Sequence, residues 1–119
     1  MKNFKDLKIW QKGFEIAVNS HKLTETFPRY ERFGLSNQIN RAGISIPSNV
    51  AEGSSRRSPL DYNRFIEISQ GSCFELETQL LVARELKFGD QNLLLAILGQ
   101  LKEEEKMLSA FGKVLMAAR

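Results

Sequence analysis

The stretch Gln38-Ile39-Asn40-Arg41-Ala42-Gly43-Ile44-Ser45-Ile46-Pro47-Ser48-Asn49-Val50-Ala51-Glu52-Gly53 decides the fold of this 119-residue chain. Apolar residues recur through it at steps of three and four, beginning at Leu35, which predicts a helix with one buried face. The same stretch contains Gly43 and Pro47, which helix propensity would not select for a helix interior. We therefore expect the tertiary structure to require them. A close approach to a neighbouring helix would suit the glycine, and the proline predicts a kink or local break.

Before this stretch, a first helix is expected over about residues 6–26, where the residue preceding Pro28 must leave the helical region. Its apolar residues form two adjacent stripes, one of Leu7, Trp10, Phe14, Ala17 and His21, the other of Ile9, Ile16 and Leu23. Two stripes are more than one partner helix can cover. This pattern is typical of a helix inside a bundle, with surface left for a subunit contact as well.

The quoted stretch itself belongs to a second helix, expected over about residues 32–54 with Gly53 as its C-terminal cap. A third helix is expected over 59–88, because Ser58 and Pro59 form a good helix start. Its middle, Ser69–Cys73, has unusually small side chains. We expect it to pack tightly against the small residues of the second helix, which are Ala42, Gly43 and Ala51.

A fourth helix is expected over 91–117, after a turn in which Gly89 adopts a left-handed cap and Asp90 starts the helix. The charged run Lys102–Lys106 within it is expected to form a solvated face. No segment alternates apolar and polar residues as a strand would. Four long helices with short connections predict an all-α fold, an antiparallel up-down-up-down four-helix bundle that forms one domain over residues 1–119.

Composition restricts the possible functions only mildly. Hydrophobic residues make up 42% of the chain, and the net charge of +3 with a pI near 9.2 permits an anionic partner without requiring one. The N-terminus lacks the apolar segment of a signal peptide, so we expect a cytoplasmic protein. Cys73 is the single cysteine, and among apolar neighbours it is expected to be a buried packing residue.

The residues argue against catalysis. A di-iron bundle needs two Glu-x-x-His motifs, and His21 is the only histidine. The Gly53-Ser-Ser-Arg-Arg57 segment lacks the lysine and the preceding strand of a phosphate loop, so a polar turn is the preferred interpretation. Ser45, Ser48, Ser69 and Ser72 have no base near them in sequence. We therefore expect no enzyme activity, no cofactor and no bound metal.

Polar residues on the second and third helices predict a structural network. Its members are expected to be Arg41, Asn49, Glu52 and Glu75. Arg41 and Glu52 lie roughly 16 Å apart along one helix, too far to pair with each other. Each is expected to meet a partner on the third helix, with Glu75 the best candidate for Arg41.

Arginines are expected at both ends of the bundle. Arg56, Arg57 and Arg64 surround the second connection, whereas Arg29 and Arg32 lie in the first connection, which an up-down bundle places at the opposite end. Dispersed cations of this kind contact nucleic-acid phosphates. A purely solvated role explains them equally well from the sequence alone.

The chain resembles a known family over nearly its whole length. The matching residues are Gln38-x-x-Arg41-Ala42-x-x-Ser45-Ile46-Pro47-x-Asn49-Val50-Ala51-Glu52-Gly53, then Arg57-Ser58, Phe65 and Gly71-Ser72-x-x-Glu75-Leu76-Glu77-Thr78-Gln79-Leu80, with Phe4-x-x-Leu7-x-Ile9-Trp10 at the start. They resemble the four-helix bundle protein family, which includes proteins encoded within intervening sequences of bacterial 23S rRNA genes. The family is similar to the accessory variability determinant of diversity-generating retroelements.

This resemblance implies a ring of five subunits. It also implies that the retroelement relatives bind nucleic acid and reverse transcriptase through a basic surface, while it supplies no catalytic residue. The leading expectation is a non-enzymatic homo-oligomer, a pentamer, that binds RNA or DNA through its arginines. The alternative is a protein-interaction scaffold with no nucleic-acid role.

Overall fold

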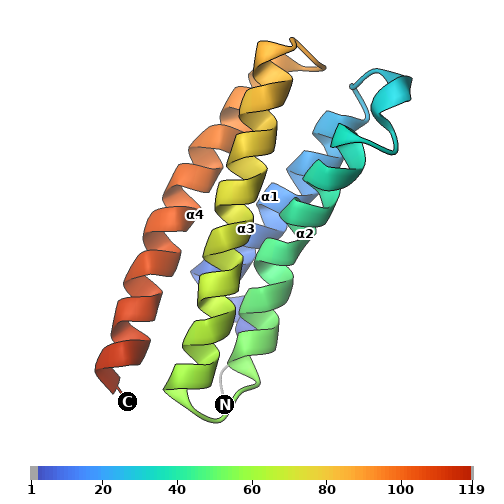
Figure 1. Cartoon of the computed structure of the whole chain (residues 1–119). Helices are drawn as coiled ribbons and strands as arrows, with labels where there is room; N and C mark the ends of the chain where they lie inside the picture. The colour runs from blue at the N-terminus through green and yellow to red at the C-terminus, as the bar shows by residue number, and fades with distance from the viewer. Residues whose placement is uncertain (1–2, 119) are drawn as a thin grey trace.

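The computed structural model describes residues 3–118, which form the expected all-α four-helix bundle (Figure 1). The four helices are α1 (Lys8–Thr24), α2 (Leu35–Ser54), α3 (Pro59–Glu85) and α4 (Gln91–Ala118). Successive helices run in opposite directions, so α1 begins and α4 ends at the same end of the bundle. Contacts join α1 to α2, α2 to α3, α3 to α4 and α4 to α1, which closes the four helices around one core. The bundle measures 46 × 21 × 20 Å.

The core consists of one apolar stripe from each helix. On α1 it is the stripe of Ile9, Ile16 and Leu23 that is buried, while Phe14 of the other stripe is half exposed. The fully buried side chains of the other helices include Ile39, Ile46, Val50, Ile66, Leu76, Leu80, Leu94, Ile97, Leu101 and Leu108. None of the helices described in residues 3–118 is long and apolar enough for a membrane crossing.

The helices on either side of the first connection are shorter than expected. Residues Phe4–Asp6 form a separate 3-10 helix, η1, and α1 starts only at Lys8. After Thr24 the chain continues in turns and a second 3-10 helix, η2 (Arg29–Glu31). Helix α2 begins at Leu35 instead of about residue 32, and the Leu35 backbone N–H donates to Glu31 Oε1 at 3.1 Å. A side chain from the connection thus satisfies one of the free donors at the start of α2.

The end of α3 also lies earlier than expected, at Glu85. Lys87 adopts a left-handed φ of 58°, and Phe88 N–H donates to Ala83 O at 2.9 Å. These contacts form a Schellman motif with Lys87 at its left-handed position. Gly89 is left-handed as expected, with φ 69°, but it lies in the turn rather than at the cap. The expected starts are confirmed for α3, capped by Ser58, and for α4, capped by Asp90.

Of the kink or local break expected at Pro47, the break does not occur, because α2 is one helix through this residue. The expected close approach of Gly43 to α3 is also wrong. A Cβ on Gly43 would lie 3.2 Å from Ser20 Oγ and 3.6 Å from Ala17 Cα, so its missing side chain makes room for α1. Small residues on α3 do face α2, since the buried Ser69 hydroxyl donates to Ile46 O at 2.9 Å.

Gly53 has a different role from the cap that the sequence predicts. It lies inside α2 and is buried, and a Cβ there would lie 2.9 Å from Phe65 Cβ and from Tyr62 Cδ1. Contacts this short force neighbouring atoms to move. Gly53 therefore sets the distance between α2 and α3 at the end of the bundle where these two helices are joined.

Candidate functional site

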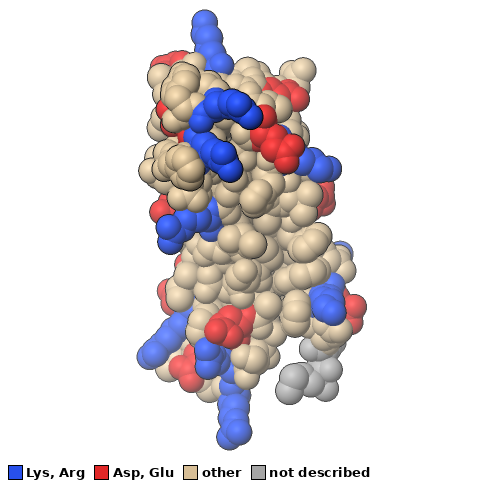
Figure 2. All heavy atoms as spheres, turned by 90° about the vertical axis from the view of Figure 1, so that its right-hand side faces the viewer, with Lys and Arg blue, Asp and Glu red and all other residues tan. Residues whose placement is uncertain are grey.

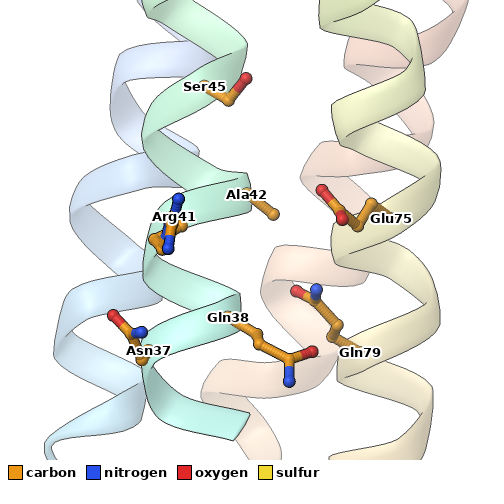
Figure 3. A pocket seen from close by; sticks show the side chains of 7 residues that line it. All are labelled: Asn37, Gln38, Arg41, Ala42, Ser45, Glu75 and Gln79. Carbon is orange, nitrogen blue, oxygen red and sulfur yellow. The ribbon is translucent and has the colours of Figure 1, made fainter. Parts of the chain in front are cut away.

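A polar pocket of about 460 Å³ lies between α2 and α3, near the start of α2 (Figure 3). Its lining consists of Asn37, Gln38, Arg41, Ala42, Ser45, Glu75 and Gln79. All of these except Asn37 belong to the motif that carries the family resemblance. Helix periodicity explains why these residues meet. The lining residues of α2 recur at steps of three and four, as do those of α3, so each group lies on one side of its helix.

A hydrogen bond between two serines links α2 to α3 beside this pocket, and an asparagine of α2 donates to the serine on its own helix. Ser45 Oγ and Ser72 Oγ lie 2.8 Å apart, and Asn49 Nδ2 donates to Ser45 O at 2.8 Å and to Ser45 Oγ at 2.9 Å. This is where the structure places Asn49 of the expected network. The two serines were missed as network members, although their small hydroxyl side chains on facing helices were the available signal.

The other three residues of the expected network lie elsewhere. Arg41 and Glu75 line the same pocket, but no ion pair joins them among the described residues. Glu52 forms its ion pair with Arg56, at 3.6 Å and four residues further along, instead of with a residue of α3. Both carboxylates lie at the surface, where such pairs contribute little to stability.

Gln79 occupies the inner wall of the pocket. Its side chain reaches from α3 toward α2, as does Glu75, while Gln38 reaches from α2 toward α3 (Figure 3). Gln79 is only 9% exposed, and its Oε1 atom is buried without a hydrogen-bond partner among the described residues. A buried acceptor of this kind lowers the stability of the folded protein unless a ligand or water donates a hydrogen bond to it.

The first connection combines cations with exposed aromatic rings. Arg29 and Arg32 lie there with Tyr30, which is 77% exposed, and Phe33, which is 87% exposed. The Arg32 guanidinium lies 5.5 Å from the centroid of the Phe33 ring. Figure 2 shows Lys and Arg side chains at the end of the bundle that holds this connection. Sequence reasoning identified the arginines but missed the two aromatic residues beside them.

The arginines at the opposite end are partly neutralised. Besides its ion pair with Glu52, Arg56 lies 4.6 Å from the centroid of the Phe65 ring, and Arg64 lies 4.0 Å from Asp61. Arg57 forms no ion pair with a described residue, and neither does Arg29 or Arg32. The structure therefore brings the five arginines into two groups, of which the first connection holds the less neutralised one.

An apolar surface covers the outer side of α1 and α2. Trp10 and Phe14 stack with ring centroids 5.0 Å apart, and Phe14, Val18 and Ile44 are exposed. Figure 2, which looks at the molecule from the right-hand side of Figure 1, shows a largely uncharged middle between charged ends. We call Phe14, Val18 and Ile44 the α1–α2 face. Of the first apolar stripe of α1 it contains Phe14, whereas Ala17 of that stripe is buried against α2.

Glu104 contradicts the expected solvated face of Lys102–Lys106. Its side chain is 0% exposed, and neither carboxylate oxygen has a hydrogen-bond partner among the described residues. A Cβ on Gly13 would lie 3.0 Å from Glu104 Oε2, so the carboxylate lies against α1. Burial raises the pKa of Glu104 to about 8, although the charge of Lys12 opposes the shift.

Two further groups near Glu104 are perturbed. Burial, followed by hydrogen bonding and repulsion with Glu77, raises the pKa of Glu105 to about 7. Cys73 is buried, and burial together with Glu104, Glu105 and Glu77 raises the pKa of its thiol, which keeps it a poor nucleophile. Within residues 3–118, no three side chains of His, Cys, Asp or Glu come together as a metal site.

Comparison with known proteins relates this fold to a family. A family model described as 23S rRNA-intervening sequence protein matches residues 5–110. The solved structure of a protein with unknown function from the S23 ribosomal protein family of Bacteroides thetaiotaomicron has a TM-score of 0.81. It is 24% identical and covers 88% of this chain and 98% of its own, a likeness that shows the fold alone. No curated protein matches. The family model spans most of the chain, and the chain therefore belongs to the 23S rRNA-intervening sequence protein family.

Proposed function

We propose that this protein is a non-enzymatic, homo-oligomeric bundle that binds nucleic acid through the α1–α2 connection. The observation that carries this proposal is the juxtaposition of Arg29 and Arg32 with the exposed rings of Tyr30 and Phe33. Arginines bind phosphates, and exposed aromatic side chains stack on unpaired bases. The combination favours single-stranded or looped RNA over a regular duplex.

Filter binding to a single-stranded RNA across a salt series tests this proposal. We expect affinity to fall as salt rises, and the Arg29→Glu/Arg32→Glu double variant to weaken binding strongly. Phe33→Ala should weaken binding roughly 5- to 150-fold, the range for loss of one stacked base. Lys102→Glu/Lys106→Glu is the matched control, because it makes the same change of charge on α4.

The arginines at the opposite end of the bundle, around the α2–α3 connection, allow a comparison within the same protein. Arg56→Glu/Arg57→Glu should weaken binding less, since Arg56 is already paired with Glu52. No binding at low salt, or binding without a salt dependence, would refute the proposal. The normal far-ultraviolet circular dichroism of each variant would show that folding is intact.

Assembly is the second part of the proposed function, with five subunits as the family resemblance implies. A closed ring larger than a dimer joins two different surfaces of neighbouring subunits. The exposed apolar side chains of residues 3–118 include two groups on different helices. One is the α1–α2 face, and the other is the outer side of α3, with Ile68, Phe74 and Val82. We propose that these two surfaces meet between adjacent subunits.

Light scattering on the purified protein at micromolar concentration tests the assembly. Ile44→Glu and Phe74→Glu should each lower the molar mass, because each places one charge in the proposed contact. Ser109→Glu introduces the same charge at an exposed position of α4 and should leave the mass unchanged. A monomeric wild-type protein would refute this part of the proposal.

A protein-interaction scaffold is the second candidate, favoured by the same apolar surfaces. In that case one surface would remain open after assembly and bind a different protein. Affinity purification after nuclease treatment distinguishes the candidates. A single stoichiometric partner, retained without nucleic acid and lost in Phe74→Glu, would favour the scaffold.

A further inference from the structure

The pocket between α2 and α3 contains hydrogen-bonding groups that find no partner among the described residues. Gln79 Oε1 is buried and accepts no hydrogen bond from any residue within 3–118. Glu75 and Arg41 form no hydrogen bond or ion pair with another described residue, although both line the same cavity. The pocket thus offers acceptors on α3 and the side-chain amide of Gln38 as a donor on α2, while the Arg41 guanidinium lies on the side of α2 turned away from Glu75 and Gln79 (Figure 3).

We propose that this pocket binds a guanine base, from a free nucleotide or from an unpaired guanosine of RNA. Guanine carries adjacent N1–H and N2–H donors, which match a carboxylate acceptor such as that of Glu75. The second N2–H is available to Gln79 Oε1. The O6 acceptor of guanine suits the side-chain amide N–H donors of Gln38, which reaches from α2 toward α3 (Figure 3).

Other ligand chemistries fit this arrangement less well. Adenine and cytosine each offer a single exocyclic amine as a donor, and uracil offers one N–H between two acceptors. An ammonium or guanidinium ion would satisfy Glu75 and Gln79, but it would leave the amide N–H donors of Gln38 without an acceptor. Guanine alone among these combines two neighbouring donors with an acceptor edge.

Size and access agree with a nucleobase. The cavity of about 460 Å³ lies within the usual range for small-molecule pockets. Gln38, Arg41 and Glu75 are exposed, so the pocket opens to the surface and leaves room for ribose and phosphate outside it. Ala42 offers an apolar surface for part of the base.

Calorimetric titration of the full chain with GMP, IMP and AMP at up to millimolar concentration tests the proposal. IMP lacks the 2-amino group, and AMP lacks both donors of the guanine edge. We expect GMP to bind at least tenfold more tightly than either. Equal affinities within about threefold, or no heat of binding with GMP, would overturn the proposal.

Two variants assign the binding to the pocket. Glu75→Gln should weaken GMP binding at least roughly tenfold, the loss expected for hydrogen bonds to a charged group. Glu67→Gln makes the same change two turns earlier on α3, outside the pocket, and should have no effect. Equal GMP affinity in both variants would overturn the assignment, and equal melting temperatures would exclude loss of folding as the cause.

A binding measurement with RNA distinguishes guanine of RNA from guanine of a free nucleotide. Only this measurement rests on the proposed nucleic-acid function. A labelled oligouridine with one central guanosine is compared with the same strand carrying inosine. A guanosine preference that Glu75→Gln removes identifies RNA as a source. If GMP binds but neither RNA does, the pocket assignment stands for the free nucleotide and the nucleic-acid function is refuted.

Discussion

Replacing Glu104 by glutamine should make the stability of this protein much less dependent on pH. Glu104 is fully buried against α1, without a hydrogen-bond partner among the described residues. A carboxyl group in such a place holds its proton more tightly in the folded chain than in the unfolded one. Ionisation therefore favours unfolding.

The size of the effect follows from the pKa values. The pKa of Glu104 is about 8 in the folded protein, against an ordinary value of 4.5. One pKa unit corresponds to about 1.4 kcal/mol, so the full difference corresponds to roughly 5 kcal/mol, as an upper limit. Below pH 4.5 Glu104 holds its proton in both the folded and the unfolded protein, so no stability is lost. Stability falls as pH rises from 4.5 to 8 and then levels off.

Urea unfolding at pH 5, 7 and 9, at one protein concentration, measures this dependence. We expect Glu104→Gln and wild type to have similar free energies of unfolding at pH 5. At pH 9 the variant should be more stable by several kcal/mol. Glu103→Gln is the matched control, because Glu103 is exposed and pairs with Lys12 at 3.2 Å. It should change stability by at most about 1 kcal/mol.

Glu105 must be separated from Glu104, since its raised pKa of about 7 acts in the same direction between pH 4.5 and 7. A Glu105→Gln variant measured at the same three pH values isolates that contribution. Identical pH profiles for wild type and Glu104→Gln would refute the reasoning. They would mean that the Glu104 carboxylate is ionised and solvated in the folded protein.

Three further predictions concern stability and are measured by thermal unfolding. Gly53→Ala should destabilise the protein by about 1–3 kcal/mol, because the added Cβ would lie 2.9 Å from atoms of α3. Gly71→Ala should stabilise it by about 0.5–1 kcal/mol, since a Cβ there would have no described atom of another element within 4 Å. Equal effects of the two substitutions on stability would contradict this packing. Ser72→Ala should cost about 1 kcal/mol by removing its hydrogen bond to Ser45; no loss of stability would show that water replaces the bond. Lys87→Gly should stabilise by about 0.5–1 kcal/mol, because Lys87 is held at a φ of 58°; a destabilised variant would count against the Schellman motif.

Much of the fold follows from local patterns in the sequence. The number of helices, the caps at Ser58 and Asp90 and most core positions could be predicted, because periodicity and turn residues act within a few residues. The boundaries near Leu35 and Glu85 could not, since a glutamate from the connection and a Schellman motif decide them.

The candidate sites were predictable only in part. Arg29 and Arg32 could be placed at one end of the bundle, but the exposure of Tyr30 and Phe33 depends on how η2 packs. Arg41 and Glu75 were expected to pair, whereas they line an open pocket. Side chains that meet across two helices depend on the rotation of each helix about its axis, which sequence spacing does not determine.

The apolar repeat at steps of three and four specifies an all-α bundle without reference to its packing. Only the packing of neighbouring helices decides that Gly43 faces α1 and that Gly53 limits the approach of α3, and the same packing buries Glu104. Glu104 occupies the step between Leu101 and Leu108 in the apolar repeat of α4, so a positional signal existed despite its charged neighbours. The physical reason is that hydrophobic periodicity selects one side of a helix, while burial depends on which neighbouring helices cover that side.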